Sequence, residues 1–220
     1  MRGCAAALLA GGSSSRFPGN KLQLQLPGDP RSLARRAAEQ FLGLECAHHA
    51  WLAPAAPEPG ALPDGWDWLQ DPGRGPAAAL ASALRHAEAQ GLDAVLLLAA
   101  DLPLIQTRHL QALLEQLPRL RADPQTPPVC ALDAQGRPQP LCALYATRHL
   151  LPLSALLDEG KRSMHALLER GWSGVELAPE VTVSVTSPRA GRATIHPCFN
   201  LNREQDWEQL LAWSKEGKLP

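Results

Sequence analysis

The sequence lacks the features that mark membrane and nucleic-acid proteins. No run reaches the roughly 18 consecutive apolar residues that a membrane-spanning helix needs, and the first residues enter an apolar stretch without the anatomy of a signal peptide. The 21 basic and 22 acidic residues give a net charge of −1, so neither a basic field nor an acidic tail is present. We therefore expect a cytoplasmic protein that acts on small molecules, with no nucleic-acid and no membrane partner.

Common metal and nucleophile motifs are missing as well. The seven histidines form no His-x-x-x-His pair, and the Gly-x-Ser-x-Gly turn of serine hydrolases does not occur. The cysteines are odd in number and include no Cys-x-x-Cys pair, which indicates reduced core thiols rather than a disulfide framework or a zinc site. They are Cys4, Cys46, Cys130, Cys142 and Cys198.

Short apolar runs alternate with longer segments of helical periodicity. This order predicts a doubly wound α/β fold with a mostly parallel sheet and one domain, whose ligands bind at the carboxyl ends of the strands. The proline-rich segment 54–63 is expected to be a surface connection without a chemical role. The expected strands are Ala5–Ala10, Ala47–Leu52, Ala94–Ala100 and a pair, Val129–Leu132 and Pro140–Tyr145; the expected helices are Ser32–Leu42, Pro76–Gln90, Thr147–Leu157, Ser163–Glu169 and Arg203–Ser214.

The segment after the first strand has the composition of a phosphate-binding loop. The apolar strand ends in Leu9 and Ala10, and Gly11 and Gly12 follow, where the absence of Cβ permits unusual backbone angles and a close approach to a ligand. Hydroxyls and positive charge come next, from Ser13 to Ser15 and from Arg16 and Lys21. Neither the Walker spacing nor the Gly-x-Gly-x-x-Gly fingerprint fits. The alternative is an ordinary Gly/Ser turn between strand and helix.

Asp101 ends the fully apolar run Ala94–Ala100 and is the first candidate for a magnesium ligand. A carboxylate there is costly to bury unless it is paired or holds a cation. One carboxylate beside a triphosphate is sufficient for magnesium, which retains water and phosphate ligands. The alternative is that Asp101 opens the turn before Pro103 or caps a helix that starts near Thr107, for which Thr107 itself is the better cap.

Two further segments carry candidate binding residues. Asp71 opens a polar turn through Gly75 into the helix at Pro76, whose free amides and dipole suit an anion. Asn200 and Asn202 lie two positions apart and would face the same way on an extended segment. The alternatives are a plain turn for Asp71, and strand-end and helix-cap duty for the two asparagines, with Asn202 capping the helix at Arg203.

Taken in order, these segments resemble the molybdenum cofactor guanylyltransferase family over nearly the whole chain. The matching motifs are Leu9-Ala10-Gly11-Gly12 with Arg16 and Lys21, Asp71-Pro72-Gly73-Arg74-Gly75-Pro76, Asp101-Leu102-Pro103, Gly160-Lys161-Arg162-Ser163-Met164 and Phe199-Asn200-Leu201-Asn202.

The resemblance implies a nucleotidyltransferase fold of the Rossmann type spanning 1–220, with about 1–105 as the nucleotide-binding half and about 106–220 as the acceptor-binding half. It implies catalytic roles for Arg16, Lys21 and Asp101, with Asp101 on the magnesium ion. The implied nucleotide- and acceptor-binding residues are Leu9, Ala10, Gly11, Gly12, Ser13, Lys21, Asp71, Gly75, Pro76, Arg162, Asn200 and Asn202.

The implied reaction transfers GMP from GTP to molybdopterin or the molybdenum cofactor and releases pyrophosphate, with transient contact to cofactor-delivery proteins or acceptor apoenzymes. Two departures leave alternatives open. The segment from Arg16 to Lys21 is one residue shorter than the family pattern, and Asn20 replaces an aspartate; the shorter spacing resembles the related cytidylyltransferases. A CTP-dependent enzyme, a transferase with a sugar-phosphate acceptor, and a non-catalytic nucleotide-binding protein are therefore the alternatives.

Overall fold

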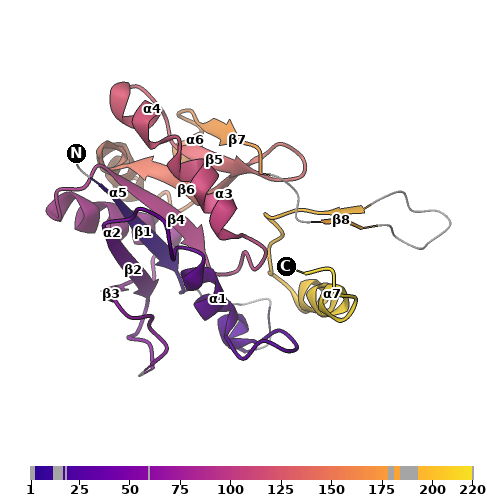
Figure 1. The fold of residues 1–220 in the computed structure, drawn as a ribbon. Coiled ribbons are helices and arrows are strands. Elements are labelled where there is room, and N and C mark those ends of the chain that lie inside the picture. Colours follow the sequence, from indigo (N-terminus) through magenta and orange to yellow (C-terminus); the bar gives the residue numbers. More distant parts are fainter. Residues whose placement is uncertain are drawn as a thin grey trace.

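The structure, a computed structural model, describes residues 3–11, 17, 19–58, 60–177, 181–183 and 193–219. Within these residues a seven-stranded sheet of order β3-β2-β1-β4-β6-β5-β7 forms the centre (Figure 1). Its first four strands are mutually parallel, and β6 is antiparallel to both of its neighbours. The strands are β1 (Cys4–Leu9), β2 (His48–Ala53), β3 (Trp66–Gln70), β4 (Ala94–Ala99), β5 (Val129–Leu132), β6 (Pro138–Ala146) and β7 (Ser173–Val175).

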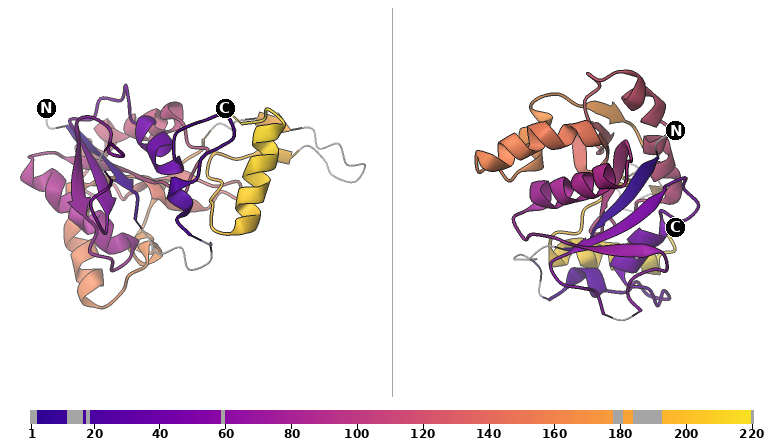
Figure 2. Two further views of the ribbon diagram at one scale, coloured as in Figure 1. Left: turned by 90° about the horizontal axis from the view of Figure 1, so that it is seen from below. Right: turned by 90° about the vertical axis from the view of Figure 1, so that its left-hand side faces the viewer.

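Helices cover both faces of this sheet, as the alternating pattern predicted (Figure 2). Strands β1 and β4 are buried along their whole length, which explains why they read as continuous apolar runs rather than as alternating ones. The helical elements are η1 (Lys21–Gln23), α1 (Leu33–Glu39), α2 (Pro76–Ala89), α3 (Thr107–Leu114), α4 (Leu117–Ala122), η2 (Thr147–His149), α5 (Leu150–Asp158), α6 (Met164–Leu168) and α7 (Glu204–Lys215).

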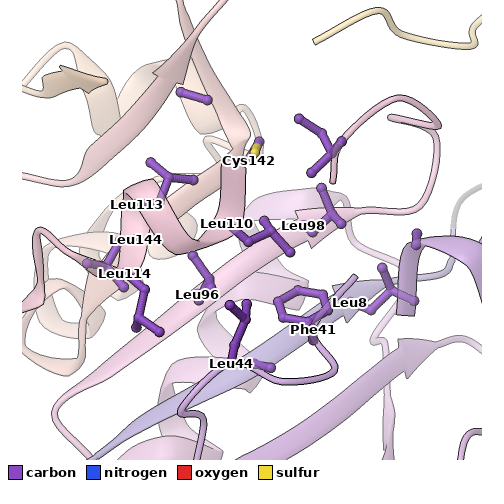
Figure 3. Packing of buried hydrophobic residues seen from close by; sticks show 14 of the residues in the cluster. Leu8, Phe41, Leu44, Leu96, Leu98, Leu110, Leu113, Leu114, Cys142 and Leu144 are labelled. Carbon is purple, nitrogen blue, oxygen red and sulfur yellow. The ribbon is translucent and has the colours of Figure 1, made fainter. Parts of the chain in front are cut away.

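Successive residues of each buried strand face opposite layers of the core. One layer joins the sheet to α1, α3 and α4, with Phe41 packed among Leu8, Leu96 and Leu98 (Figure 3). The other layer joins the sheet to α2, α5 and α6. The doubly wound α/β class expected from the sequence is thus confirmed.

A third apolar cluster carries the C-terminal part of the described chain. Helix α7 contributes Leu210, and the segment before it contributes Leu201, which packs with Leu33, Leu104 and Phe17. Figure 1 shows α7 beside a two-stranded ribbon formed by β8 (Val181–Val183) and β9 (Ala193–Ile195). This packing brings the residues before α7 to the carboxyl edge of the main sheet.

Most expected elements occur, with corrected ends. Helix α1 stops at Glu39 rather than Leu42, and the segment Thr147–Leu157 divides into η2 and α5. The antiparallel pair β5–β6 forms around the turn 133–136 as predicted. Among the described residues, no helix combines the length and apolarity required to cross a membrane.

His149 is a buried titratable group, and its hydrogen bonds show which ring nitrogen carries the proton. Its Nδ1 accepts a hydrogen bond from the N–H of Ala146 at 3.1 Å, so the proton of the neutral ring is on Nε2, 3.2 Å from the carbonyl oxygen of Thr126. Burial lowers the pKa of His149 from 6.5 to about 4. The folded chain therefore holds the ring neutral at pH values where the unfolded chain protonates it.

We expect His149 to make the free energy of unfolding fall as the pH drops from about 6.5 to about 4, by up to about 3 kcal/mol. The sign follows because the unfolded state takes up a proton in this window and the folded state does not. Urea denaturation of the wild type and of His149→Asn at pH 7.5 and 4.5 measures this. Asparagine retains an acceptor for Ala146, and the variant should lose less stability on acidification. An identical loss in both proteins would contradict the expectation.

Candidate functional site

The candidate site lies at the carboxyl edge of the sheet. The N–H of Ala10 donates to a carbonyl of β2 at 2.9 Å, and the N–H of Ala100 donates to the last carbonyl of β1 at 3.0 Å. The N–H of Asp71 donates to the last carbonyl of β2 at 2.9 Å. Gly11, Asp71 and Asp101 therefore follow neighbouring strands at the same edge, where parallel α/β sheets bind ligands.

Lys21 connects three segments that are distant in sequence. Its Nζ lies 2.9 Å from Oδ2 of Asp101 and 2.5 Å from the carbonyl oxygen of Leu201. The side chains of Lys21 and Asp101 are 12% and 20% exposed, so the ion pair is largely shielded from water. The backbone is tied as well, because the N–H of Leu201 donates to the carbonyl of Asp101 at 2.9 Å. The glycine-loop segment, the end of β4 and the segment before α7 thus meet at one point.

Two buried oxygens in these segments have no hydrogen-bond partner among the described residues: Oδ1 of Asp101, and Oδ1 of Asn200, the residue before Leu201. Buried polar atoms are normally paired, so orphaned ones call for a ligand or an ion. Carboxylate, amide and carbonyl oxygens of this kind are the ligands that suit magnesium. The residues present therefore fit a hard divalent cation, with Asp101 as its charged ligand. The described chain holds no cluster of three or more His, Cys, Asp or Glu side chains.

Gly11 lies where the ends of β1, β2 and β3 crowd together. A Cβ on Gly11 would be 2.7 Å from Cδ of Pro54, 3.0 Å from Oδ2 of Asp71 and 3.4 Å from Cα of Ala53. Its backbone is not in the positive-φ region, which corrects one of the two sequence-based reasons for this glycine, the unusual backbone angle. Gly11 is needed for close approach rather than for an unusual angle. Pro54, to which the sequence assigned no role, forms one wall of this position.

The turn after Asp71 leads into α2 with an uncapped N-terminus. Oδ1 of Asp71 accepts the N–H of Gly73 at 2.9 Å, so Asp71 builds its turn with one oxygen and directs the other toward Gly11. Gly75 precedes α2 with φ 95° and gives no side-chain cap, and Pro76 follows it. The N–H groups of Ala78 and Ala79 donate to the carbonyl of Gly75, so this helix start offers an anion its positive dipole end rather than a set of free amides.

Arg162 is exposed, and its backbone reaches the start of α2. A Cβ on Gly75 would lie 3.5 Å from the carbonyl oxygen of Arg162. The basic turn 160–164 is therefore next to the turn that follows Asp71. The structure brings these two predicted segments together.

Three predicted site residues are not covered by the structure. Gly12, Ser13 and Arg16 lie outside the described residues. Asn202 is exposed, unlike Asn200. The alternative that Asn202 caps the last helix is wrong: α7 is capped at Arg203, because the carboxylate of Asp206 accepts the N–H groups of both Asn202 and Arg203. Hydrogen bonds within the segment explain this difference.

Asp101 is not a helix cap either. Gln106 occupies the cap position of α3, and Thr107, the cap expected from the sequence, is instead the first helical residue. Its N–H donates to Oε1 of Gln40 at 3.0 Å. The capping alternative for Asp101 is thus excluded. The other alternative, a place in the turn before Pro103, is observed, since the N–H of Leu102 donates to the carbonyl of Ala99 at 3.2 Å across Asp101.

Comparisons with known proteins agree with this geometry. Residues 6–181 match the family described as MobA-like NTP transferase domain. The chain belongs to this family. Its sequence is 36% identical over 127 residues to a "Probable molybdenum cofactor guanylyltransferase" of Synechococcus elongatus, and the match covers 54% of this chain and 61% of the relative. The matched part thus spans less than two thirds of that curated relative.

Solved structures share the fold of this MobA-like domain. Molybdopterin-guanine dinucleotide biosynthesis protein A from Archaeoglobus fulgidus superposes with a TM-score of 0.70 at 17% identity, over 96% of this chain and 99% of that one. CMP:2-keto-3-deoxy-manno-octonic acid synthetase, in complex with CTP, gives a TM-score of 0.66 at 16% identity, over 98% and 99%. These identities support the fold alone. The family match confirms that the domain is of the nucleotidyltransferase type.

Proposed function

We propose that this MobA-like protein transfers GMP from GTP to the terminal phosphate of molybdopterin or the molybdenum cofactor and releases pyrophosphate. The observation that carries the proposal is the meeting of Lys21, Asp101 and the carbonyl of Leu201 at the sheet edge that also carries Gly11. Cationic and carboxylate groups at the ends of neighbouring parallel strands are what a nucleoside triphosphate and its cation require. The resemblance to guanylyltransferases supplies the identity of both substrates.

The reaction is a displacement at phosphorus. An oxygen of the molybdopterin phosphate attacks the α-phosphorus of GTP and forms a new P–O bond. The bond from this phosphorus to the α,β-bridging oxygen breaks, and pyrophosphate leaves with the electron pair. The attacking monoester is already anionic near neutral pH, so the site has to overcome charge repulsion and align the groups rather than supply a strong base.

Each part of the site has a proposed role in this displacement. Lys21, with Arg16, balances the charge that develops on the leaving pyrophosphate. Asp101 and Asn200 hold magnesium, which would supply electrostatic neutralisation of the triphosphate. The absence of a Cβ at Gly11 lets Pro54 and Asp71 pack against its backbone, which fixes the start of the loop that holds the nucleotide. Asp71, Gly75 and the positive end of the α2 dipole receive polar atoms of the nucleotide.

The acceptor side is proposed to include the basic turn that contains Arg162, which adjoins the start of α2. Protein partners that deliver molybdopterin or receive the product, and a cytoplasmic location, belong to the same proposal. They follow from the family rather than from a particular surface of the molecule.

The experiment that tests the function is pyrophosphate release with molybdopterin and each of the four nucleoside triphosphates in turn. Release with GTP alone, dependent on molybdopterin, is the expected result. Release with CTP alone would replace the proposal by a cytidylyltransferase, which the short segment between Arg16 and Lys21 favours. Release with a sugar phosphate but not with molybdopterin would change the acceptor class. Tight GTP binding without release would indicate a non-catalytic nucleotide-binding protein.

A further inference from the structure

The ammonium of Lys21 occupies the point where an oxygen of Asp101 and the carbonyl oxygen of Leu201 converge. It lies 2.9 Å from Oδ2 of Asp101 and 2.5 Å from the carbonyl oxygen of Leu201, both within hydrogen-bond distance. Only 12% of the Lys21 side chain is exposed, so water provides little competition for these contacts. The lysine nitrogen therefore stands where a cation would be expected.

This arrangement balances charge but not hydrogen bonding. The positive charge of Lys21 compensates the carboxylate of Asp101, which would otherwise be costly in so shielded a place. Oδ1 of Asp101 and Oδ1 of Asn200 nevertheless have no partner among the described residues. An ammonium offers three N–H groups, and two are directed to Asp101 and Leu201. The lysine thus leaves one oxygen of the Asp101 carboxylate without a hydrogen bond.

We infer that Lys21 is a built-in occupant of the cation site and that it competes with the metal for Asp101 until a nucleotide removes it. The inference rests on the proposed function in one respect, because it takes Asp101 as the metal ligand. A divalent ion that approaches Asp101 while Lys21 is in place meets a like charge a few ångströms away, in surroundings that screen it poorly. A triphosphate offers the lysine a stronger anionic partner and so frees the carboxylate.

The local structure allows this exchange without refolding. Lys21 begins η1, which is capped by Asn20, whose side chain accepts the N–H of Leu22 at 3.1 Å. The segment is therefore anchored while the four-carbon stem of the lysine can rotate. When Lys21 leaves, the carbonyl of Leu201 loses its partner and joins the oxygens open to the metal. Nucleotide binding then precedes metal binding, or the two enter together.

The test measures binding of Mn²⁺ by electron paramagnetic resonance in the absence of nucleotide. The wild type should bind weakly, and Lys21→Met should bind at least about tenfold more tightly, because it removes the competing charge and retains the apolar stem. Asp101→Asn added to Lys21→Met should abolish the gain. Lys218→Met is the matched control, since Lys218 forms a surface ion pair with Glu216. This control should bind Mn²⁺ as the wild type does.

A second arm adds GTP. Here the order of the affinities should reverse. Lys21→Met should bind the Mn²⁺–GTP complex more weakly than the wild type does, because the lysine now contacts the phosphates. Thermal melting checks that each variant folds, and Lys21→Gln replaces Lys21→Met if the methionine variant does not. Two results without nucleotide would overturn the inference. One is tight binding of Mn²⁺ to the wild type, and the other is a folded Lys21 variant that binds Mn²⁺ no more tightly than the wild type does. The first arm contains no nucleotide, so its result does not depend on whether the protein uses GTP. Failure of the proposed function and failure of this inference can therefore be told apart.

Discussion

Asp101→Asn is expected to lower the rate of pyrophosphate release by about 100- to 1,000-fold and to leave the fold intact. The reason is that the only charged metal ligand proposed for the site becomes neutral, which removes several kcal/mol of electrostatic stabilisation. The fold should persist because the tie to the segment before α7 uses the backbone carbonyl of Asp101, which the substitution retains. Steady-state release assays with the purified variant, together with its circular dichroism, provide the measurement.

Asp93→Asn is the matched control for this variant. Asp93 precedes β4, whereas Asp101 follows it, so the two carboxylates stand at opposite ends of one strand. Asp93 also has a cationic partner, Arg121, whose Nε lies 3.0 Å from Oδ2. Asp93→Asn should keep the activity close to that of the wild type. Equal losses in both variants would show that the effect comes from the fold and not from the site.

Gly11→Ala is expected to weaken nucleotide binding by about tenfold or more. The new Cβ would lie 2.7 Å from Cδ of Pro54 and 3.4 Å from Cα of Ala53, and neither is the end of a flexible side chain. The start of the loop must therefore move away from β2, at a cost of about 1–3 kcal/mol for overpacking. That movement separates Gly11 from Asp71, which lies at the same edge. Isothermal titration with GTP and Mg²⁺ measures the affinity.

Gly174→Ala is the control for this variant, because it introduces a similar steric clash at a position far from the site. A Cβ on Gly174 would also come within 2.7 Å of another atom, Cδ2 of Leu132, but this contact lies on β7 at the far edge of the sheet. The control should bind GTP as the wild type does, with at most a loss of stability. If Gly11→Ala leaves the affinity unchanged, the proposal that packing at Gly11 holds the nucleotide-binding loop in place is wrong.

The fold could be predicted where burial controls the pattern. Strands β1 and β4 are covered on both faces, so their apolar runs identify them, and proline at the start of α2 marks that helix correctly. Short elements gave no such signal. Helix α4 has six residues with Pro118 in its first turn, and β7 has three residues with a central glycine. Their positions are determined by tertiary packing rather than by local propensity.

The site could be predicted from its side chains but not from its backbone. Asp101 and Lys21 were identified from the strand end and the glycine loop, and the structure places them in contact. The carbonyl of Leu201 carries no sequence signal, since every residue has one, and its role depends on a contact across 180 positions of the chain. Pro54 was likewise missed, because a proline-rich connection gives no sign of the glycine it packs against.

The central claim is that the glycine loop and Asp101 hold one nucleotide and its cation together. Titration of GTP into the wild type and Asp101→Asn, each with and without Mg²⁺, tests it most directly. The account predicts that Mg²⁺ tightens GTP binding to the wild type about tenfold or more and that Asp101→Asn loses this gain, while its metal-free affinity is at least that of the wild type because Lys21 is released from the carboxylate. An equal gain from Mg²⁺ in both proteins would contradict it.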